Sequence, residues 1–177
     1  FTPLYMRENE TRHASGSSRS VGAGGSRKAA TWPLKPTATQ AQAAQLSARF
    51  LTRFHYDAQP LDDAMSAKVY ADYFKLLDPD KVFFTQQDMD QFAPLKTKFD
   101  DAIWNQDLAA PFDIYNKFLQ RAVQRMSYAR DLLKAGFSFD GDESYQYDRK
   151  DAAWAKDDAA LNDLWRKRTM NDWLRLK

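Results

Sequence analysis

Apolar residues recur at intervals of three and four from Thr37 to the end of the chain, and no other sequence feature constrains the fold as strongly. This spacing places apolar side chains on one face of successive α-helices. Hydrophobic residues make up 44% of the chain and aromatic residues 14%, enough to fill a sizeable core. We therefore predict an all-α fold for residues 37–177, an irregular multi-helix domain of about five to six helices.

The first helix is expected over residues 39–55, where Leu46, Phe50 and Phe54 form one stripe and Leu51 lies beside it. Residues four positions apart share a helix face. Phe and Tyr stripes at helical spacing are more typical of a core than of a cofactor site. The stripe is therefore expected to be buried.

The second helix is expected from near Leu61 to Asp78, because Pro79 disfavours helical geometry in the residue before it. Its buried face is predicted to contain six residues: Leu61, Met65, Val69, Tyr73, Phe74 and Leu77. The segment Val82-Phe83-Phe84 is too short to define a strand. It is expected to place its aromatic side chains in the helical core.

A third helix is expected to begin at Thr85, because Thr85 and Asp88 have the pattern of a capping box with Asp in place of Glu. Its apolar face is predicted to carry Phe92, Leu95, Phe99 and Ile103. Pro94 removes a backbone donor inside this segment. The helix should therefore be kinked or divided there.

Two longer helices are expected in the C-terminal half. One runs from Pro111, which suits a first turn, to Gly136, which suits a helix end. Its stripe is predicted to be Tyr115, Phe118 or Leu119, Ala122, Met126, Ala129 and Leu133. The other covers residues 157–176, with a common side formed by Leu161, Leu164, Trp165, Trp173 and Leu176.

Between these two helices, residues 137–156 are predicted to form a packed loop with a turn at Asp140-Gly141.

Residues 1–36 differ in composition from the rest of the chain. They hold six Lys and Arg residues against two Glu, and four of the six glycines. This composition predicts a disordered, basic, Gly/Ser-rich leader. Lys28 ends a Gly-rich stretch, but Ala29 stands where a phosphate-binding loop has Ser or Thr, so a flexible tail is favoured.

Residues with catalytic potential are few. The chain has no cysteine, which excludes disulfides and thiolate chemistry, and it lacks the Ser-x-x-Lys and Gly-x-Ser-x-Gly spacings of common nucleophiles. His13 lies in the leader, and His55 lies at a helix end, where a capping or packing role is favoured. We therefore assign no catalytic, cofactor-binding or metal-binding residue, and expect no cofactor.

One acidic segment has the spacing that opens a calcium-binding loop, with Asp140, Asp142 and Ser144 at alternate positions. Such a loop needs Gly at its sixth position and Glu at its twelfth. Tyr145 and Asp151 stand at those positions. A solvated, turn-rich loop is therefore the favoured interpretation.

Basic residues cluster on the last two helices. The clusters are Arg121, Arg125, Arg130 and Lys134, and then Arg166, Lys167 and Arg168. Either could contact nucleic acid, but intervening aspartates cancel much of the positive field. Solvated helix faces and no nucleic-acid partner are therefore expected. No run of about 18 apolar residues occurs, so no membrane span is predicted.

Several short motifs occur together in a specific order. They are His55-Tyr56, Pro60-Leu61-Asp62-Asp63, Tyr73-Phe74, Leu77-Asp78-Pro79, Phe83-Phe84, Ile114-Tyr115-Asn116, Asp148-Arg149, Trp154 and Leu164-Trp165-Arg166-Lys167-Arg168. In this order and spacing, residues 39–177 resemble the N-terminal helical region of tail-specific, or carboxy-terminal processing, proteases of the Ser/Lys-dyad type.

The resemblance implies a periplasmic parent protein, a serine-type peptidase whose later parts are a PDZ domain and a catalytic domain. No residue of this chain matches the catalytic motifs, so the chain is expected to be inactive alone. Because it begins with Phe1, it is expected to be a fragment. The implied partners are the downstream PDZ and protease domains and protein substrates with nonpolar carboxyl termini. The implied role is to scaffold the protease body and help enclose these substrates.

An alternative is a freestanding helical protein-interaction module without protease activity. Coding sequence beyond Lys177 distinguishes the two, because only the first interpretation predicts PDZ and protease domains there. Periplasmic localisation comes from the resemblance alone, since residues 14–30 lack the apolar stretch of a secretory signal. The sequence leaves the parent's substrates, the oligomeric state and the docking surface open.

Overall fold

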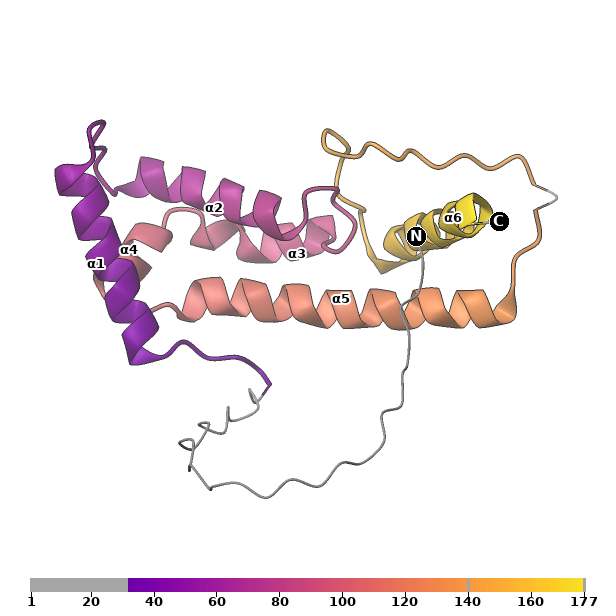
Figure 1. Ribbon diagram of the computed structural model, residues 1–177, viewed down its shortest axis with the longest axis horizontal. Coiled ribbons are helices and arrows are strands. Elements are labelled where there is room, and N and C mark those ends of the chain that lie inside the picture. The colour runs from indigo at the N-terminus through magenta and orange to yellow at the C-terminus, as the bar shows by residue number, and fades with distance from the viewer. Residues whose placement is uncertain (1–31, 140, 177) are drawn as a thin grey trace, which may run out of the picture. The chain divides into compact units, whose positions relative to one another are not determined.

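The computed structural model describes residues 32–139 and 141–176 and contains six α-helices and one short 3₁₀ helix within them (Figure 1). The helices are α1 (Ala38–Phe54), α2 (Asp63–Leu77), α3 (Gln86–Phe92), η1 (Ala93–Leu95), α4 (Phe99–Trp104), α5 (Ala109–Ala135) and α6 (Asp158–Leu176). Within the described residues, the only β pairing is an isolated bridge between Thr85 and Ala155. The all-α prediction is confirmed.

Local sequence signals set most helix ends. Thr37 and Thr85 each form a reciprocal capping box, the second with Asp88 as predicted. Pro94 lies in η1, and this 3₁₀ turn separates α3 from α4. Gly136 follows α5 with φ of 79° and ψ of 173°, a conformation that is almost restricted to glycine.

The core is an aromatic cluster contributed by α2, α3, α4, α5 and the segment between α2 and α3. Its buried members are Tyr70, Phe74, Phe84, Phe92, Phe99 and Ile114. Phe84 and Ile114 have no exposed surface. Phe83 packs beside them, with its ring centroid 5.2 Å from that of Phe118 and 5.7 Å from that of Trp165. The prediction that this segment buries its aromatic residues is therefore confirmed.

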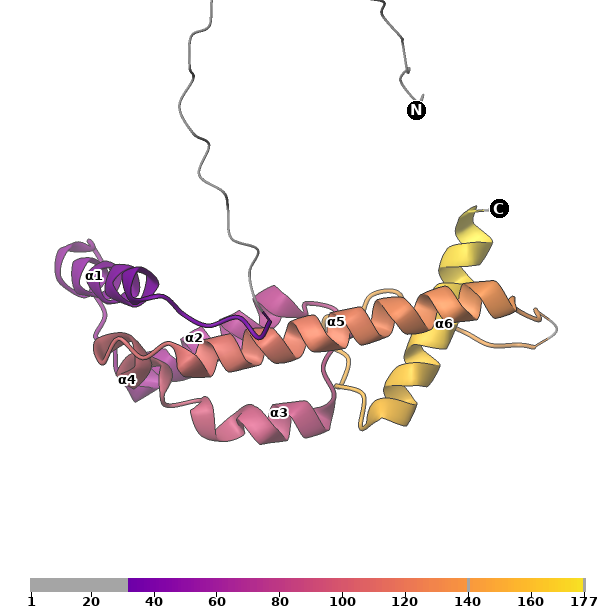
Figure 2. The same ribbon diagram turned by 90° about the horizontal axis from the view of Figure 1, so that it is seen from below.

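The helices surround this core from different directions. α2 and α3 both run alongside the N-terminal part of α5, and α6 crosses the C-terminal part of α5 (Figures 1 and 2). Leu161 and Trp165 of α6 are buried, and the indole N–H of Trp165 donates a 2.5 Å hydrogen bond to the Val82 carbonyl. α6 is therefore fixed to both α5 and the segment after α2.

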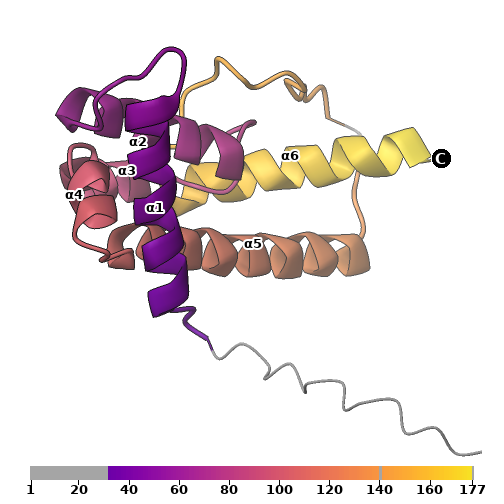
Figure 3. The ribbon, with the colours of Figure 1, turned by 60° about the vertical axis from the view of Figure 1, so that its left-hand side comes forward.

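α1 lies beside α4 at one edge of this helical unit (Figure 3). Its two buried residues are Ala41 and Ala48. Gln45 donates a 2.7 Å hydrogen bond to the Trp104 carbonyl, and Gln106 donates one of 2.9 Å to Gln45. Small side chains thus allow the α1 backbone to approach α4 closely.

The apolar stripe predicted for α1 is correct in spacing and wrong in orientation. Leu46, Phe50, Leu51 and Phe54 are between 58% and 70% exposed. At about 100° per residue, Phe50 lies about 180° from Ala41 around the helix. The large side chains therefore point away from the face that packs on α4.

The stripes predicted for the two long helices are only partly buried. Met126 and Leu133 of α5 are exposed, as are Trp173 and Leu176 of α6. In their place, α5 buries Ile114 and two charged residues, Arg121 and Arg125. The predicted stripes fail toward the C-terminal ends of both helices.

The loop between α5 and α6 packs against the start of α3. The Gln86 N–H donates a 2.8 Å hydrogen bond to the Ala155 carbonyl, next to the Thr85–Ala155 bridge. Trp154 contacts Phe84 with ring centroids 6.2 Å apart. The prediction of a packed loop is confirmed for Trp154 and Ala155, whereas most of residues 138–148 are exposed, and Asp140 of the predicted turn lies outside the described residues.

Residues 32–36, assigned by sequence to the leader, lie within the described part of the chain. Leu34 and Asn116 exchange two hydrogen bonds, of 2.9 Å from the Leu34 N–H and 2.8 Å to the Leu34 carbonyl. These bonds attach the segment before α1 to α5. Residues 1–31, including Lys28 and His13, lie outside the described residues.

Candidate binding surfaces

A buried carboxylate organises the segment between α2 and α3. Asp78 is 1% exposed and accepts hydrogen bonds from the backbone N–H groups of Val82, Phe83 and Phe84, at 2.8, 2.8 and 3.0 Å. Burial raises the pKa of Asp78, and these three donors offset part of that effect. The Asp78 carboxylate thus stabilises the segment Val82-Phe83-Phe84 in the core.

A second buried carboxylate, Asp88 of α3, joins α3 to α5. Its partners include the Thr85 N–H at 3.0 Å, Lys117 at 3.1 Å and the guanidinium of Arg121. Burial acts to raise the pKa of Asp88, but the hydrogen bonds from Arg121, Thr85 and Lys117 outweigh it and lower the pKa. Arg121 also contacts Asp158 at the start of α6.

Arg121 and Arg125 correct the sequence prediction that their cluster lies on a solvated helix face. Both are 7% exposed. Arg125 donates to Asn162 of α6, lies 5.5 Å from the Tyr128 ring centroid, and leaves its buried Nε without a hydrogen-bond partner among the described residues. Burial lowers the pKa of Arg125. These arginines join helices instead of forming a free basic surface.

The basic cluster on α6 carries paired charges. Arg166 contacts Glu143 at 2.6 Å and Asp163 at 2.9 Å, and Lys167 contacts Asp163 at 2.9 Å. Arg168 is 3.8 Å from Asp172. Neighbouring carboxylates therefore offset this positive charge, as the sequence analysis expected of the intervening aspartates.

Hydroxyl groups in the core have structural partners. Ser66 accepts a hydrogen bond from the Phe99 N–H and donates one to the Lys96 carbonyl, while Thr169 donates one to the Trp165 carbonyl.

His55 occupies the C-cap position of α1, as predicted, and is exposed beside Tyr56. Within residues 32–139 and 141–176, no group of three acidic or histidine side chains could hold a metal ion.

The exposed face of α1 is the first candidate binding surface. We define the α1 apolar face as Leu46, Phe50 and Phe54 together with Tyr56, which follows the helix; they are 58%, 59%, 70% and 96% exposed. Phe50 and Phe54 contact each other with ring centroids 5.2 Å apart. Contiguous exposed apolar residues of this size are typical of interaction surfaces.

A groove between α1 and α2 adjoins this face. Its cavity of about 440 Å³ is lined by Ala48 and Leu51 of α1, Met65 and Val69 of α2, and Ile103 of α4. These side chains make the lining mainly apolar. The groove therefore suits apolar side chains of a partner segment.

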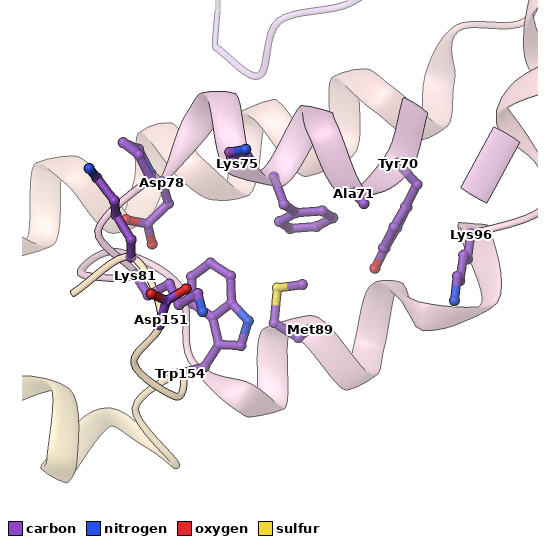
Figure 4. Close-up of a pocket in the computed structure, with 12 residues that line it drawn as sticks. Tyr70, Ala71, Lys75, Asp78, Lys81, Met89, Lys96, Asp151 and Trp154 are labelled. Carbon is purple, nitrogen blue, oxygen red and sulfur yellow. The ribbon is translucent and has the colours of Figure 1, made fainter. Parts of the chain in front are cut away.

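A cleft between α2 and α3 is the second candidate surface. Its cavity of about 630 Å³ has a floor of Tyr70, Phe74, Met89 and Trp154. Tyr70, Met89 and Trp154 are labelled in Figure 4. Lysines surround the cleft: Lys75, Lys81, Lys96 and Lys150. We call this region the lysine-rimmed cleft. This cleft was not predicted, because its lining comes from four separate segments of the chain.

The described chain is thus an all-helical domain that offers apolar surfaces for binding, while its buried polar groups stabilise the fold. The family described as tail specific protease N-terminal domain matches residues 47–177. The chain belongs to this family. It is 37% identical over 128 residues to a protein of Haemophilus influenzae named tail-specific protease.

That alignment covers 72% of this chain and 18% of the relative. The chain therefore spans less than a fifth of the length of the curated protein it matches. The family match begins inside α1 and includes every later helix. Across the described residues, no helix is both long enough and apolar enough to cross a membrane.

Proposed function

We propose that this chain is the noncatalytic helical N-terminal region of a carboxy-terminal processing serine endopeptidase. It scaffolds the protease body and helps to enclose protein substrates for proteolysis. Its same-chain partners are a PDZ domain and a catalytic domain that carries the serine nucleophile and the lysine base. The substrates have nonpolar carboxyl termini, and the parent acts in the periplasm.

The α1 apolar face is the observation that supports this proposal most directly. Phe50 and Phe54 lie on the surface of the described residues, on the side of α1 that faces away from the buried Ala41. A domain that docks against a larger body needs such a face. The relative's additional length leaves room for that body.

The buried polar groups support a noncatalytic role. Asp78 accepts hydrogen bonds from backbone amides, Asp88 accepts them from Arg121, and Ser66 is hydrogen-bonded to two backbone groups. A nucleophile or general base must instead be able to reach a substrate. We therefore expect this chain alone to show no serine-dependent peptidase activity.

The proposal is tested in the full-length parent protein with Phe50→Glu/Phe54→Glu, which places two charges on the α1 apolar face. Thr39→Glu/Gln42→Glu is the matched control, because it adds the same charge at exposed polar positions of the same helix that do not line the groove. Cleavage of a protein substrate and of a short peptide are measured, together with thermal unfolding.

We expect the phenylalanine variant to lose protein-substrate cleavage by about tenfold and to unfold at a lower temperature, because buried charges disrupt docking. The control should match the wild type. Circular dichroism of the 177-residue chain with the same substitutions checks that the helices remain. Equal behaviour of the two variants in the parent would overturn the docking role of α1.

A further inference from the structure

The lysine-rimmed cleft combines an apolar floor with a cationic rim. Met89 and Trp154 are half-buried and pack against the core, and they expose their remaining apolar surface to the cleft. Its volume of about 630 Å³ lies within the ordinary range of ligand-binding sites. Such a floor favours an apolar group because water leaves it on binding.

Positive charge reaches the rim from separate parts of the chain. Lys75 is on α2, Lys96 follows η1, and Lys150 is in the loop before α6. All three are exposed, and none has an ion-pair partner among residues 32–139 and 141–176. Their charge is therefore available to a ligand.

Two aspartates in the lining, Asp78 and Asp151, offset part of the charge of the four lysines and leave an excess of two positive charges. Both carboxylate oxygens of Asp78 accept backbone N–H groups, and its side chain is almost completely buried. Asp151 lies near Lys81 at one end of the cleft (Figure 4). The lysines thus outnumber the aspartates and determine the sign of the local field.

Two of the lysines, Lys81 and Lys96, lie at opposite ends of the cleft, with the apolar floor between them (Figure 4). Lys96 lies beside Tyr70 at one end, and Lys81 lies near Trp154 at the other, with Met89 between (Figure 4). Lys81 donates a 2.6 Å hydrogen bond to the Ala152 carbonyl and lies 5.8 Å from the Trp154 ring centroid. This bond fixes one cation at its end of the cleft.

We propose that the lysine-rimmed cleft binds an acidic peptide segment of a partner protein, with an apolar side chain on the floor and carboxylates on both sides of it. The charge arrangement favours an extended segment, because a ligand with one terminal charge can use only one end. Neither the α1 apolar face nor its groove takes part, so the proposal is independent of the docking role of α1.

The test uses the 177-residue chain and a fluorescein-labelled hexapeptide with two glutamates on each side of a central Leu-Leu pair. Fluorescence anisotropy measures binding. One comparison peptide has glutamine in place of glutamate, and another has serine in place of leucine. We expect each replacement to weaken binding, and binding of the acidic peptide to fall as salt is raised from 50 to 500 mM.

Lys75→Gln/Lys96→Gln removes two rim charges, whereas Lys68→Gln/Lys134→Gln removes two exposed helical lysines outside the cleft. We expect the first variant to bind about five- to tenfold more weakly, and the second to bind like the wild type. Thermal unfolding checks that both variants fold.

Equal binding of the two variants would overturn the proposal. So would equal binding of the glutamate and glutamine peptides by the wild type, a result that needs no variant. Competition by octanoate as effective as that of the unlabelled peptide would also overturn it, because a small anion with one charge would then be sufficient.

Discussion

Arg121 on α5 donates two hydrogen bonds to the carboxylate of Asp88 on α3, from Nε to Oδ2 at 2.9 Å and from Nη2 to Oδ1 at 3.0 Å. Both side chains are buried, with 9% and 4% of their surface exposed. A guanidinium that binds both oxygens of a carboxylate fixes distance and orientation together. This pair therefore sets how α3 lies against α5.

Asp88→Asn should destabilise the fold strongly, because it keeps the shape of the side chain but leaves the buried Arg121 charge poorly compensated. We expect a loss of about 3 to 5 kcal/mol in the free energy of unfolding, measured by urea denaturation. Asp158→Asn removes the other carboxylate partner of Arg121, whose side chain is 61% exposed. This control should lose at most about 1 kcal/mol. Similar losses of stability in both variants would contradict the conclusion that Asp88 is the main partner of the buried Arg121 charge.

Low pH should destabilise the fold through protonation of the Asp88 carboxylate. Its pKa is lowered in the folded state, so its contribution is present above the unfolded pKa of about 3.9 and is lost as pH falls through the folded value. The stability difference between wild type and Asp88→Asn should therefore be largest near neutral pH and shrink below about pH 4. Urea denaturation at pH 7, 5 and 3 measures this, and a constant difference would argue against it.

Ser66→Ala should show the cost of unsatisfied backbone groups. The hydroxyl has no exposed surface, accepts from the Phe99 N–H at 2.8 Å and donates to the Lys96 carbonyl at 3.0 Å. We expect a loss of about 2 to 4 kcal/mol, because both backbone groups lose a partner. Ser47→Ala, at an exposed position of α1, should change stability by less than about 0.5 kcal/mol. Equal effects in chemical denaturation would rule out the proposed role of Ser66.

Two glycines provide a matched pair for backbone strain. Gly136 has φ of 79°, and an added Cβ there would meet no atom within 4 Å, so any cost of Gly136→Ala is conformational. We expect it to lower stability by about 1 to 3 kcal/mol. Gly141→Ala would meet only the Glu143 side chain at 3.9 Å and should be neutral or slightly stabilising. Thermal unfolding of both variants measures the contrast, and a neutral Gly136→Ala would show that the C-terminus of α5 adjusts freely.

The helix ends could be predicted because their causes are local. The Thr85–Asp88 capping box, the break at Pro94 and the glycine after α5 each act within a few residues. The orientation of α1 could not be predicted in the same way. Periodicity shows that Leu46, Phe50 and Phe54 share a face, but it does not show whether that face or the alanine face packs against α4.

The burial of Arg121 and Arg125 also could not be predicted from the spacing of residues in the sequence. Arginine at regular helical intervals ordinarily indicates a solvated face. Here the partner of Arg121 lies 33 residues earlier, and the partner of Arg125 lies 37 residues later. The lysine-rimmed cleft has the same origin, since α2, α3 and the loop before α6 meet only in the folded chain.

The alanine contact of α1 has a consequence for how the molecule opens. Ala41 and Ala48 are its only buried residues within the described range, and the aromatic core cluster includes none of its side chains. Detaching this helix therefore exposes little hydrocarbon and leaves the aromatic cluster intact. Segments with so few buried contacts undergo local unfolding at a lower free energy than the global transition. The amide hydrogens of α1 should accordingly exchange with solvent before those of α5, which makes the first helix a separable arm of the domain.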